Sequence, residues 1–323
     1  NLTEPDEPPS AARIRAARAW LRQQVGSNAP VWLLPCRLLR RKNVAEALLL
    51  TRWLRPQAWL VTTAGVSSAD EQKYADALDA AARKHGWPLR LGVLRGDAPG
   101  KPAVSELFAA CEAVVLTSIQ EGFGLPYLEA AAAGRPLVAR SLPNIAPDLA
   151  SFGFRFPQMY EDVRVSTDLF HWSAEHRRQT RLYRDWRATL PRACRRFAEQ
   201  PVIPASAKPP SCVPFSRLTL TAQLEVLGHP PEDSWRCCAP LNPLLETWRQ
   251  RAAAGRLGVT PWPKQAGHWL SGHAYAERFA EIAASVARAP AAGPQASVAA
   301  QNDFIRERLR APWLYPLLWN SET

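Results

Sequence analysis

Short apolar runs alternate with amphipathic stretches in the first half of the chain. The apolar runs hold four to six residues each: VWLL (31–34), AWLVTT (58–63), LRLGVL (89–94), AVVL (113–116) and LVAR (137–140). Helical periodicity fills the intervals, over 44–54, 70–84, 103–110 and 126–133. Buried runs of this length, separated by helices, are typical of a parallel sheet covered on both faces. The pattern predicts an α/β fold with a doubly wound, Rossmann-like sheet over residues 30–150.

The pattern differs on both sides of this region. Residues 1–29 are predicted to form a Pro-rich acidic linker and then a helix, which Ser10 can cap. From 151 to 265 the rhythm is mixed, which indicates a mostly helical, irregular insertion. The insertion includes a long basic helix over 173–199, broken near Pro191, and a helix over 216–227.

The carboxy-terminal part holds one clear helix and a tail. The segment 271–287 is amphipathic at helical spacing, and 289–323 is a linker followed by a tail. The tail ends in WLYPLLW (313–319), whose Trp and Tyr suit a membrane interface but can equally pack on a further domain. Both interpretations of the tail stay open, and no apolar run is long enough for a membrane-spanning helix.

Composition narrows the classes of partner. The net charge of +11 favours anionic partners, and much of the Arg lies between Arg177 and Arg196. This run is either a solvated helix that packs Leu182 and Trp186 inward, the favoured interpretation, or a docking face for anionic lipid or glycan. No RNA-binding aromatic signature or helix-turn-helix pattern supports nucleic acid. The cysteines form no C-x-x-C pair, so neither zinc nor disulfides are expected, and a reducing cytoplasm fits.

The clearest candidate for a ligand-binding site is the segment EGFGLPYLE, residues 121–129, which follows the fourth predicted strand. Glu121 is expected in the loop and Glu129 in the first turn of the next helix, both at the carboxyl edge of the sheet, where open α/β sheets bind ligands. Gly122 and Gly124 allow the backbone to approach a ligand, and the helix start offers N–H groups to phosphate. Alone, either glutamate is ordinary; their joint placement around a Gly-x-Gly turn is not.

The same segment carries a family resemblance. The pattern S-x-x-E-G-F-G-L-P-x-L-E-A-x-A-x-G-x-P, from Ser118 to Pro136, resembles the E-x7-E signature of the retaining GT-B glycosyltransferases. A second feature of that family is a GRL-x-x-x-K-G turn after the first strand of the domain. This chain has CRLLRRKN there, which keeps the Arg37-to-Lys42 spacing and replaces the two glycines by Cys36 and Asn43.

The resemblance implies roles for these residues. Arg37 and Lys42 would hold the diphosphate of a nucleotide-sugar donor, Glu121 would contact the transferred sugar, and Glu129 would contact the ribose. Two fixed cations suit this chemistry because the leaving diphosphate gathers negative charge as the glycosidic bond breaks. The donor-binding set implied by the motif is completed by Ser118, Gly122, Phe123, Gly124 and Leu125.

The function implied is retaining transfer of a hexosyl group from a nucleoside diphosphate sugar to a glycan, lipid or small acceptor. Members of the family usually need no metal, and no cofactor is expected. The resemblance covers about 30–150 and implies that the 271–287 helix completes this domain. The family's amino-terminal acceptor domain has no counterpart here, so a partner domain is expected. The alternative is a donor-binding module without turnover of its own. An epimerase or phosphorylase on the same fold also stays open.

Two further expectations concern the cellular compartment of the chain and the base of its nucleotide donor. The chain is expected in the cytoplasm, with peripheral contact at the inner membrane face if the tail binds lipid. The choice among UDP, GDP and ADP is expected to involve the 92–97 loop and the end of the 113–118 strand.

Overall fold

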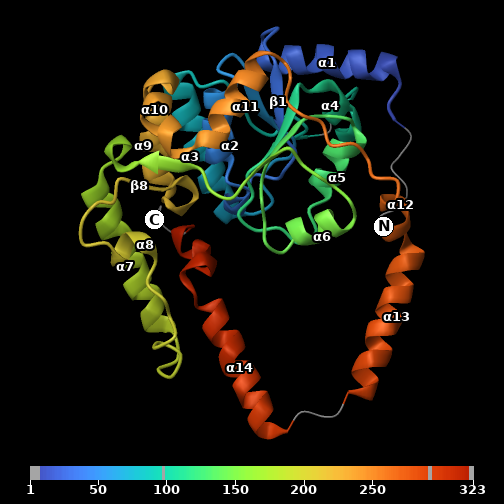
Figure 1. Cartoon of the computed structure of the whole chain (residues 1–323). Coiled ribbons are helices and arrows are strands. Elements are labelled where there is room, and N and C mark those ends of the chain that lie inside the picture. Colours follow the sequence, from blue (N-terminus) through green and yellow to red (C-terminus); the bar gives the residue numbers. More distant parts are fainter. Residues whose placement is uncertain (1–7, 97–98, 290–292, 320–323) are drawn as a thin grey trace.

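A six-stranded parallel sheet forms the centre of the computed structural model, which describes residues 8–96, 99–289 and 293–319 (Figure 1). Most of the expected amino-terminal linker and residues 290–292 of the second linker lie outside the described residues. The strands are β1 (Val31–Leu34), β2 (Trp59–Thr62), β3 (Leu89–Arg90), β4 (Ala113–Leu116), β5 (Leu137–Arg140) and β6 (Gln158–Tyr160). Their order is β3-β2-β1-β4-β5-β6, which confirms the predicted doubly wound sheet. The order reverses between β1 and β4, and ligands bind at such a point in this fold class.

Two strands differ from the sequence prediction. The third predicted strand stops after Arg90, because Gly92 takes a positive φ of 62° and turns the chain away from the sheet. A sixth strand, β6, pairs in parallel with β5. It escaped prediction because it has three residues and begins with the polar Gln158, so it has no apolar run to reveal it.

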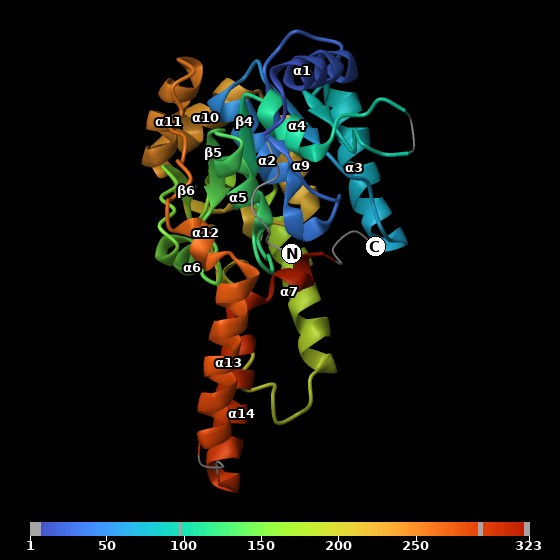
Figure 2. The same ribbon diagram turned by 90° about the vertical axis from the view of Figure 1, so that its right-hand side faces the viewer.

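Helices cover the sheet on both faces, as the alternating pattern predicted (Figures 1 and 2). They are α1 (Ala11–Val25), α2 (Val44–Leu54), α3 (Ala69–His85), α4 (Val104–Ala110), α5 (Leu125–Ala132) and α6 (Ala146–Ser151). Ser10 caps α1, because its hydroxyl accepts a hydrogen bond from the Arg13 amide at 3.4 Å. Helices α2 to α6 each carry the chain back from one parallel strand to the next, and α1 precedes the first strand.

Helix α2 is buried along its whole length, including its polar residues. One side faces the sheet, and the other is covered by three helices of the insertion: α9 (Leu220–Gly228), α10 (Pro231–Cys238) and α11 (Pro243–Ala253). The sequence VAEALLLTRWL is apolar on nearly every face, and such a helix needs cover all round. The insertion is therefore part of the core.

The rest of the insertion contains the basic helix α7 (Trp172–Thr189), the short α8 (Val202–Ala205) and an antiparallel ribbon of β7 (Arg164–Ser166) and β8 (Cys212–Pro214). Helix α7 ends at Thr189, at the break predicted near Pro191, because Leu190 precedes Pro191 and is thereby disfavoured in helical conformation. Arg181 and Arg184 are exposed, whereas Leu182 is half-buried. This arrangement matches the solvated basic helix that the composition favoured.

Three helices follow the insertion: α12 (Ala266–Trp269), α13 (Gly272–Arg288) and α14 (Pro294–Arg308). Helix α13 forms where the sequence predicted a helix, but none of its residues is buried. Both views show α13 and α14 extending away from the body on the side opposite α1 (Figures 1 and 2). In this structure α13 therefore does not complete the sheet domain as expected, because its apolar residues, such as Phe279 at 63% exposure, face solvent.

The tail returns to the body after α14 and packs on the insertion. Leu314 and Leu318 are buried, and the Arg217 guanidinium lies 3.8 Å from the centre of the Tyr315 ring. Arg217 also donates a hydrogen bond to the Pro312 carbonyl at 3.2 Å. Neither interpretation of the tail anticipated this arrangement. In the part of the chain that the structure describes, no helix has both the length and the apolar character of a membrane span.

One buried ion pair connects several of these elements. Glu46, in the first turn of α2, lies 2.5 Å from the Arg140 guanidinium at the end of β5. Its carboxylate also accepts hydrogen bonds from Tyr160 of β6 at 2.7 Å and from Asn43 at 3.0 Å. Burial raises the pKa of the Glu46 carboxyl, and Arg140 and Tyr160 partly offset that effect. Burial alone would lower the pKa of Arg140, but the Glu46 charge reverses this and raises it.

We expect Glu46→Ala to lower the free energy of unfolding by about 3–5 kcal/mol, because it leaves the buried Arg140 without its partner. Urea unfolding followed by circular dichroism measures the loss. The matched control is Asp79→Ala, which removes an exposed ion pair with Arg83 on α3 and should cost at most about 1 kcal/mol. Equal losses in the two variants would contradict a special role for Glu46.

Candidate functional site

Two loops meet at the carboxyl edge of the sheet, where the strand order reverses. The first follows β1 and spans 35–43, and the second follows β4 and spans 117–124. The Ile119 amide donates to the Arg41 carbonyl at 2.9 Å, and the Thr117 hydroxyl donates to the Lys42 carbonyl at 2.9 Å. These bonds fix the basic loop and the acidic loop against each other.

The Glu121 carboxylate is the centre of the site. One oxygen accepts hydrogen bonds from the Lys42 ammonium and, at 2.5 Å, from the Ser118 hydroxyl. The other oxygen lies 3.2 Å from the Arg41 guanidinium. The Asn144 amide donates to the Glu121 carbonyl at 2.9 Å and so holds the backbone of the loop. The structure therefore brings together three of the predicted residues: Lys42, Ser118 and Glu121.

The charge state of Glu121 follows from these contacts. Partial burial alone would raise the pKa of this carboxyl. The hydrogen bonds from Lys42 and Ser118 and the positive charges of Lys42 and Arg41 outweigh burial, and the pKa of Glu121 is lowered. Glu121 is therefore a carboxylate at neutral pH, and its oxygens can accept hydrogen bonds from a ligand.

Arg37 lies apart from this cluster. Its guanidinium donates to the Ser67 hydroxyl at 2.9 Å, and Ser67 in turn donates to Glu71 at 2.8 Å. Arg41, which the sequence analysis did not select, takes the place beside Lys42. The run of basic residues 40–42 in the sequence indicates that a second cation lies near Lys42, but it does not say which one. In the structure this run forms a 3-10 turn, Arg40–Lys42. Only the turn decides which of the neighbouring side chains reach Glu121.

The turn tolerates the loss of both glycines. Asn43 has a positive φ of 52°, alone among the described non-glycine residues, and Asn is one of the few residues that adopt this conformation readily. Its buried side chain donates to Glu46 and accepts from Gln223 at 3.2 Å. Cys36 is also buried, and burial raises the pKa of its thiol to about 12, so it stays neutral. The left-handed geometry at the end of the turn is thus kept by Asn43.

The second loop leads directly into α5. Gly124 precedes the helix with a φ of 82°, and a Cβ there would lie 3.1 Å from Ile145, so glycine is required on both counts. Pro126 lies in the first turn of the helix, where its missing N–H costs little. Because the helix starts at Leu125, Glu129 lies in the second turn, one residue later than expected. Glu129 is exposed overall, but partial desolvation of its carboxyl raises the pKa of that group.

Apolar side chains are exposed beside the charged cluster. Phe123 and Leu125 are 47% and 46% exposed, and Gly122 of the second loop is exposed as well. Exposed apolar groups next to fixed charges are typical of a surface that a ligand covers. Over the described ranges, His, Cys, Asp and Glu do not gather in groups of three that could hold a metal ion.

A family model described as glycosyl transferases group 1 matches residues 21–153, which is less than half of the 323 residues. No curated protein matches the chain significantly. Several solved structures are similar to parts of it. The crystal structure of Anabaena HepE with UDP and glucose is 26% identical and has a TM-score of 0.33; the match covers 43% of this chain and 36% of HepE. The chain thus spans well under half the length of that protein.

Two more solved structures are similar at lower identity. One is the C-terminal domain of a group 1 glycosyl transferase (LpcC) from Francisella tularensis, at 18% identity and a TM-score of 0.34, covering 44% of this chain and 80% of that one. The other is a UDP-forming trehalose-phosphate synthase from Burkholderia xenovorans, at 15% identity and a TM-score of 0.35, covering 77% of this chain and 50% of that one.

The two glutamates of the site should respond oppositely to pH. A carboxyl whose pKa is lowered by folding adds stability above its ordinary pKa of 4.5, and this is lost as the pH falls through the lowered value. We therefore expect Glu121→Gln to be less stable than the natural chain at neutral pH, by about 1–3 kcal/mol, with a smaller deficit in acid.

Glu129→Gln is the matched control for this measurement. Because folding raises the pKa of Glu129, its ionisation opposes folding as the pH rises above 4.5. Glu129→Gln should consequently be as stable as the natural chain at neutral pH, or more so. Urea unfolding at several pH values tests both, and a deficit for Glu121→Gln that does not change with pH would contradict the assignment.

Proposed function

We propose that this chain carries the donor-binding half of a retaining glycosyltransferase, which transfers a sugar from a nucleoside diphosphate sugar to a glycan, lipid or small acceptor. The observation that carries the proposal is the meeting of Lys42, Ser118 and Glu121 at the point where the strand order reverses. The match of residues 21–153 to the glycosyl transferase model supports the same conclusion independently of the side-chain contacts.

In this proposal the basic loop after β1 binds the donor diphosphate. Lys42 and Arg41 already lie against a carboxylate, Glu121, and the diphosphate would compete with it for both cations. Arg37, which donates to the Ser67 hydroxyl, is a further cation of this loop and would turn toward the phosphates. The first N–H groups of α5 add a positive partial charge at the same edge.

The reaction then exchanges one glycosidic bond for another. The bond between the anomeric carbon and the diphosphate oxygen breaks, and the nucleoside diphosphate leaves with the electron pair. The acceptor hydroxyl forms the new bond to the anomeric carbon and loses its proton. The cations of the loop favour this step because negative charge grows on the departing diphosphate. Glu121 accepts hydrogen bonds from the sugar hydroxyls and orients the ring.

Glu129 and the exposed side chains of the second loop serve the other end of the donor. The Glu129 carboxylate accepts hydrogen bonds from the ribose hydroxyls, and Phe123 and Leu125 offer apolar surface beside it. We propose that transfer needs no metal ion and no cofactor, and chelation with EDTA should leave the rate unchanged. The six free cysteines support a reducing compartment such as the cytoplasm.

A donor-binding module that needs a partner domain is the second candidate. It is favoured by the apolar side of α13, where Tyr275, Phe279 and Ile282 are each more than half exposed. A face of this kind on a soluble chain suits contact with another domain. In that case the chain binds the donor for a partner domain and does not itself transfer sugar.

Donor binding can be tested by calorimetric titration of the chain with UDP, GDP and ADP. We expect one nucleotide to bind, and Glu129→Ala to weaken it about ten- to a hundredfold through the loss of charged hydrogen bonds to the ribose. Lys42→Ala should weaken the nucleoside diphosphate strongly but the nucleoside monophosphate little. Glu281→Ala, an exposed glutamate on the distant α13, should leave binding unchanged.

The outcomes separate the two candidates. Binding with transfer after an acceptor domain is added supports the enzyme, and binding without transfer in any combination supports the module. A folded chain that binds none of the three nucleotides would overturn both. Retention is checked by the anomeric configuration of the first-formed product in a proton NMR spectrum, where an inverted product would refute the retaining mechanism alone.

A further inference from the structure

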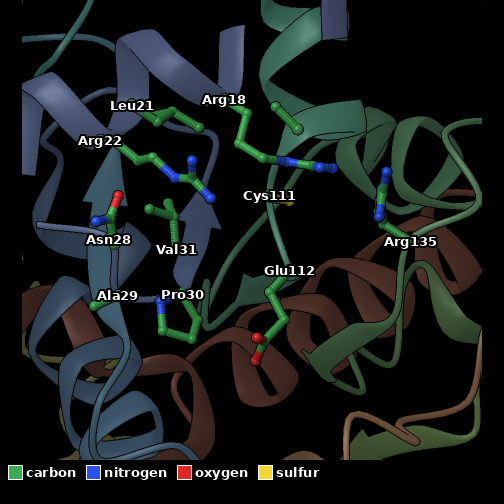
Figure 3. Close-up of a pocket in the computed structure, with 11 residues that line it drawn as sticks. Arg18, Leu21, Arg22, Asn28, Ala29, Pro30, Val31, Cys111, Glu112 and Arg135 are labelled. Atoms are coloured by element: carbon green, nitrogen blue, oxygen red, sulfur yellow. The ribbon is translucent and has the colours of Figure 1, made fainter. Parts of the chain in front are cut away.

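A second basic site lies at the opposite edge of the sheet. A pocket of about 300 Å³ opens beside the first residues of β1 and β4, at the ends of these strands that face away from Glu121. Its lining comes from α1, the segment between α4 and β4, and the turn between α5 and β5. Figure 3 shows Arg18, Arg22 and Arg135 reaching toward this opening from two sides.

The two arginines of α1 lack partners. Arg18 and Arg22 are one helical turn apart and exposed, and neither has an ion pair or a side-chain hydrogen bond to any other described residue. Like charges at this spacing on a helix repel each other and destabilise it by a few tenths of a kcal/mol. No acidic side chain of the described residues forms an ion pair with either arginine.

Arg135 faces them from the far side of the pocket. One of its terminal nitrogens donates to the Ala109 carbonyl at the end of α4, which fixes the side chain in place. Its Nε atom is buried and has no hydrogen-bond partner among the described residues. A buried N–H without an acceptor is costly, so the rest of the Arg135 guanidinium is left to interact with a ligand in the pocket.

The one carboxylate of the lining does not neutralise these arginines. Glu112 lies 3.0 Å from the Arg55 guanidinium and accepts a hydrogen bond from the Trp32 indole at 3.3 Å. Figure 3 shows its carboxylate turned away from the three guanidinium groups. The Cys111 thiol also lines the pocket, and burial raises its pKa to about 12, so it adds no negative charge.

Packing holds the arginines in this arrangement. Ala17, Leu21 and Val25 bury the inner side of α1, and Arg13 forms an ion pair with Glu106 of α4. The position of α1 is therefore set by apolar burial and by a pair outside the pocket. The convergence of its arginines is a consequence of that packing and persists without a ligand.

Arginines often lie near helix C-termini, because they offset the negative end of the helix dipole. Arg135 serves α4 in this way through the Ala109 carbonyl. Arg18 and Arg22 donate to no carbonyl of the described chain, although Arg22 lies in the last turn of α1. Helix capping therefore accounts for Arg135, and the dipole of α1 favours Arg22, but neither effect explains why Arg18 and Arg22 both line the pocket.

We propose that this pocket binds a phosphate group of a small molecule, at a site separate from the donor site. Guanidinium groups match phosphate oxygens with paired hydrogen bonds, and three of them suit a doubly charged phosphate better than a single carboxylate. The volume accommodates a phosphate with a small organic portion, such as a phosphate monoester. The proposal does not depend on the function proposed above.

The experiment is a calorimetric titration of the full chain with inorganic phosphate, with chloride at matched ionic strength as the reference. We expect the double variant Arg18→Gln/Arg22→Gln to bind phosphate at least about tenfold more weakly. Arg15→Gln is the matched control, because Arg15 is an exposed arginine of the same helix that does not line the pocket. It should bind phosphate as the natural chain does.

The donor site also attracts phosphate, so the titration is repeated in Lys42→Ala. Phosphate binding that survives Lys42→Ala and disappears in the double variant supports the pocket. Three results would overturn it: no phosphate binding, equal loss in Arg15→Gln, or full binding by a double variant whose unfolding temperature is unchanged. Nucleotide binding by the double variant should stay at its natural value, whether or not the proposed function holds.

Discussion

The buried charge of Glu46 imposes the constraint on which the central architecture depends. A carboxylate with no exposed surface must keep its partners, because removing any of them leaves an uncompensated charge in the core. Its partners come from different elements: Arg140 from β5, Tyr160 from β6 and Asn43 from the loop after β1. The sheet edge, the start of α2 and the basic loop are therefore positioned by one interaction. The same interaction helps to fix the site at Glu121, because Asn43 contacts Glu46 and ends the turn that contains Lys42.

The insertion belongs to the same core. Arg52 of α2 donates to the Leu227 carbonyl at 2.5 Å and so satisfies the C-terminal end of α9. Burial without a carboxylate partner lowers the pKa of Arg52 to about 10. Trp53 donates to Ser234 of α10 at 3.0 Å and packs edge-on against Trp235. Helix α2 thus joins two parts of the chain that are about 180 residues apart, and removing the insertion would expose an apolar helix.

The excess of basic residues has two different structural uses at the two edges of the sheet. At the carboxyl edge, Lys42 and Arg41 face Glu121, so one carboxylate already offsets part of their positive charge. At the amino edge, Arg18 and Arg22 face no acid of the described chain. In the proposed function the donor diphosphate would replace this carboxylate, which suits a substrate that must leave again. The amino edge holds an unbalanced positive charge, which suits an anion that stays bound.

The sequence by itself determined the elements whose signal is local. Buried runs between amphipathic helices predicted the parallel sheet, and the helix predicted over 126–133 lies within one residue of α5 at each end, because helix ends are set by the backbone of a few residues. The tertiary structure alone decided what depends on contacts between distant segments. Those contacts include the choice of Arg41 over Arg37 as the neighbour of Glu121 and the buried pairing of Glu46 with Arg140, 94 residues along the chain. Hydrophobic periodicity shows which side of one segment faces the core and which faces solvent. The partner of a side chain is decided only when two distant segments come into contact.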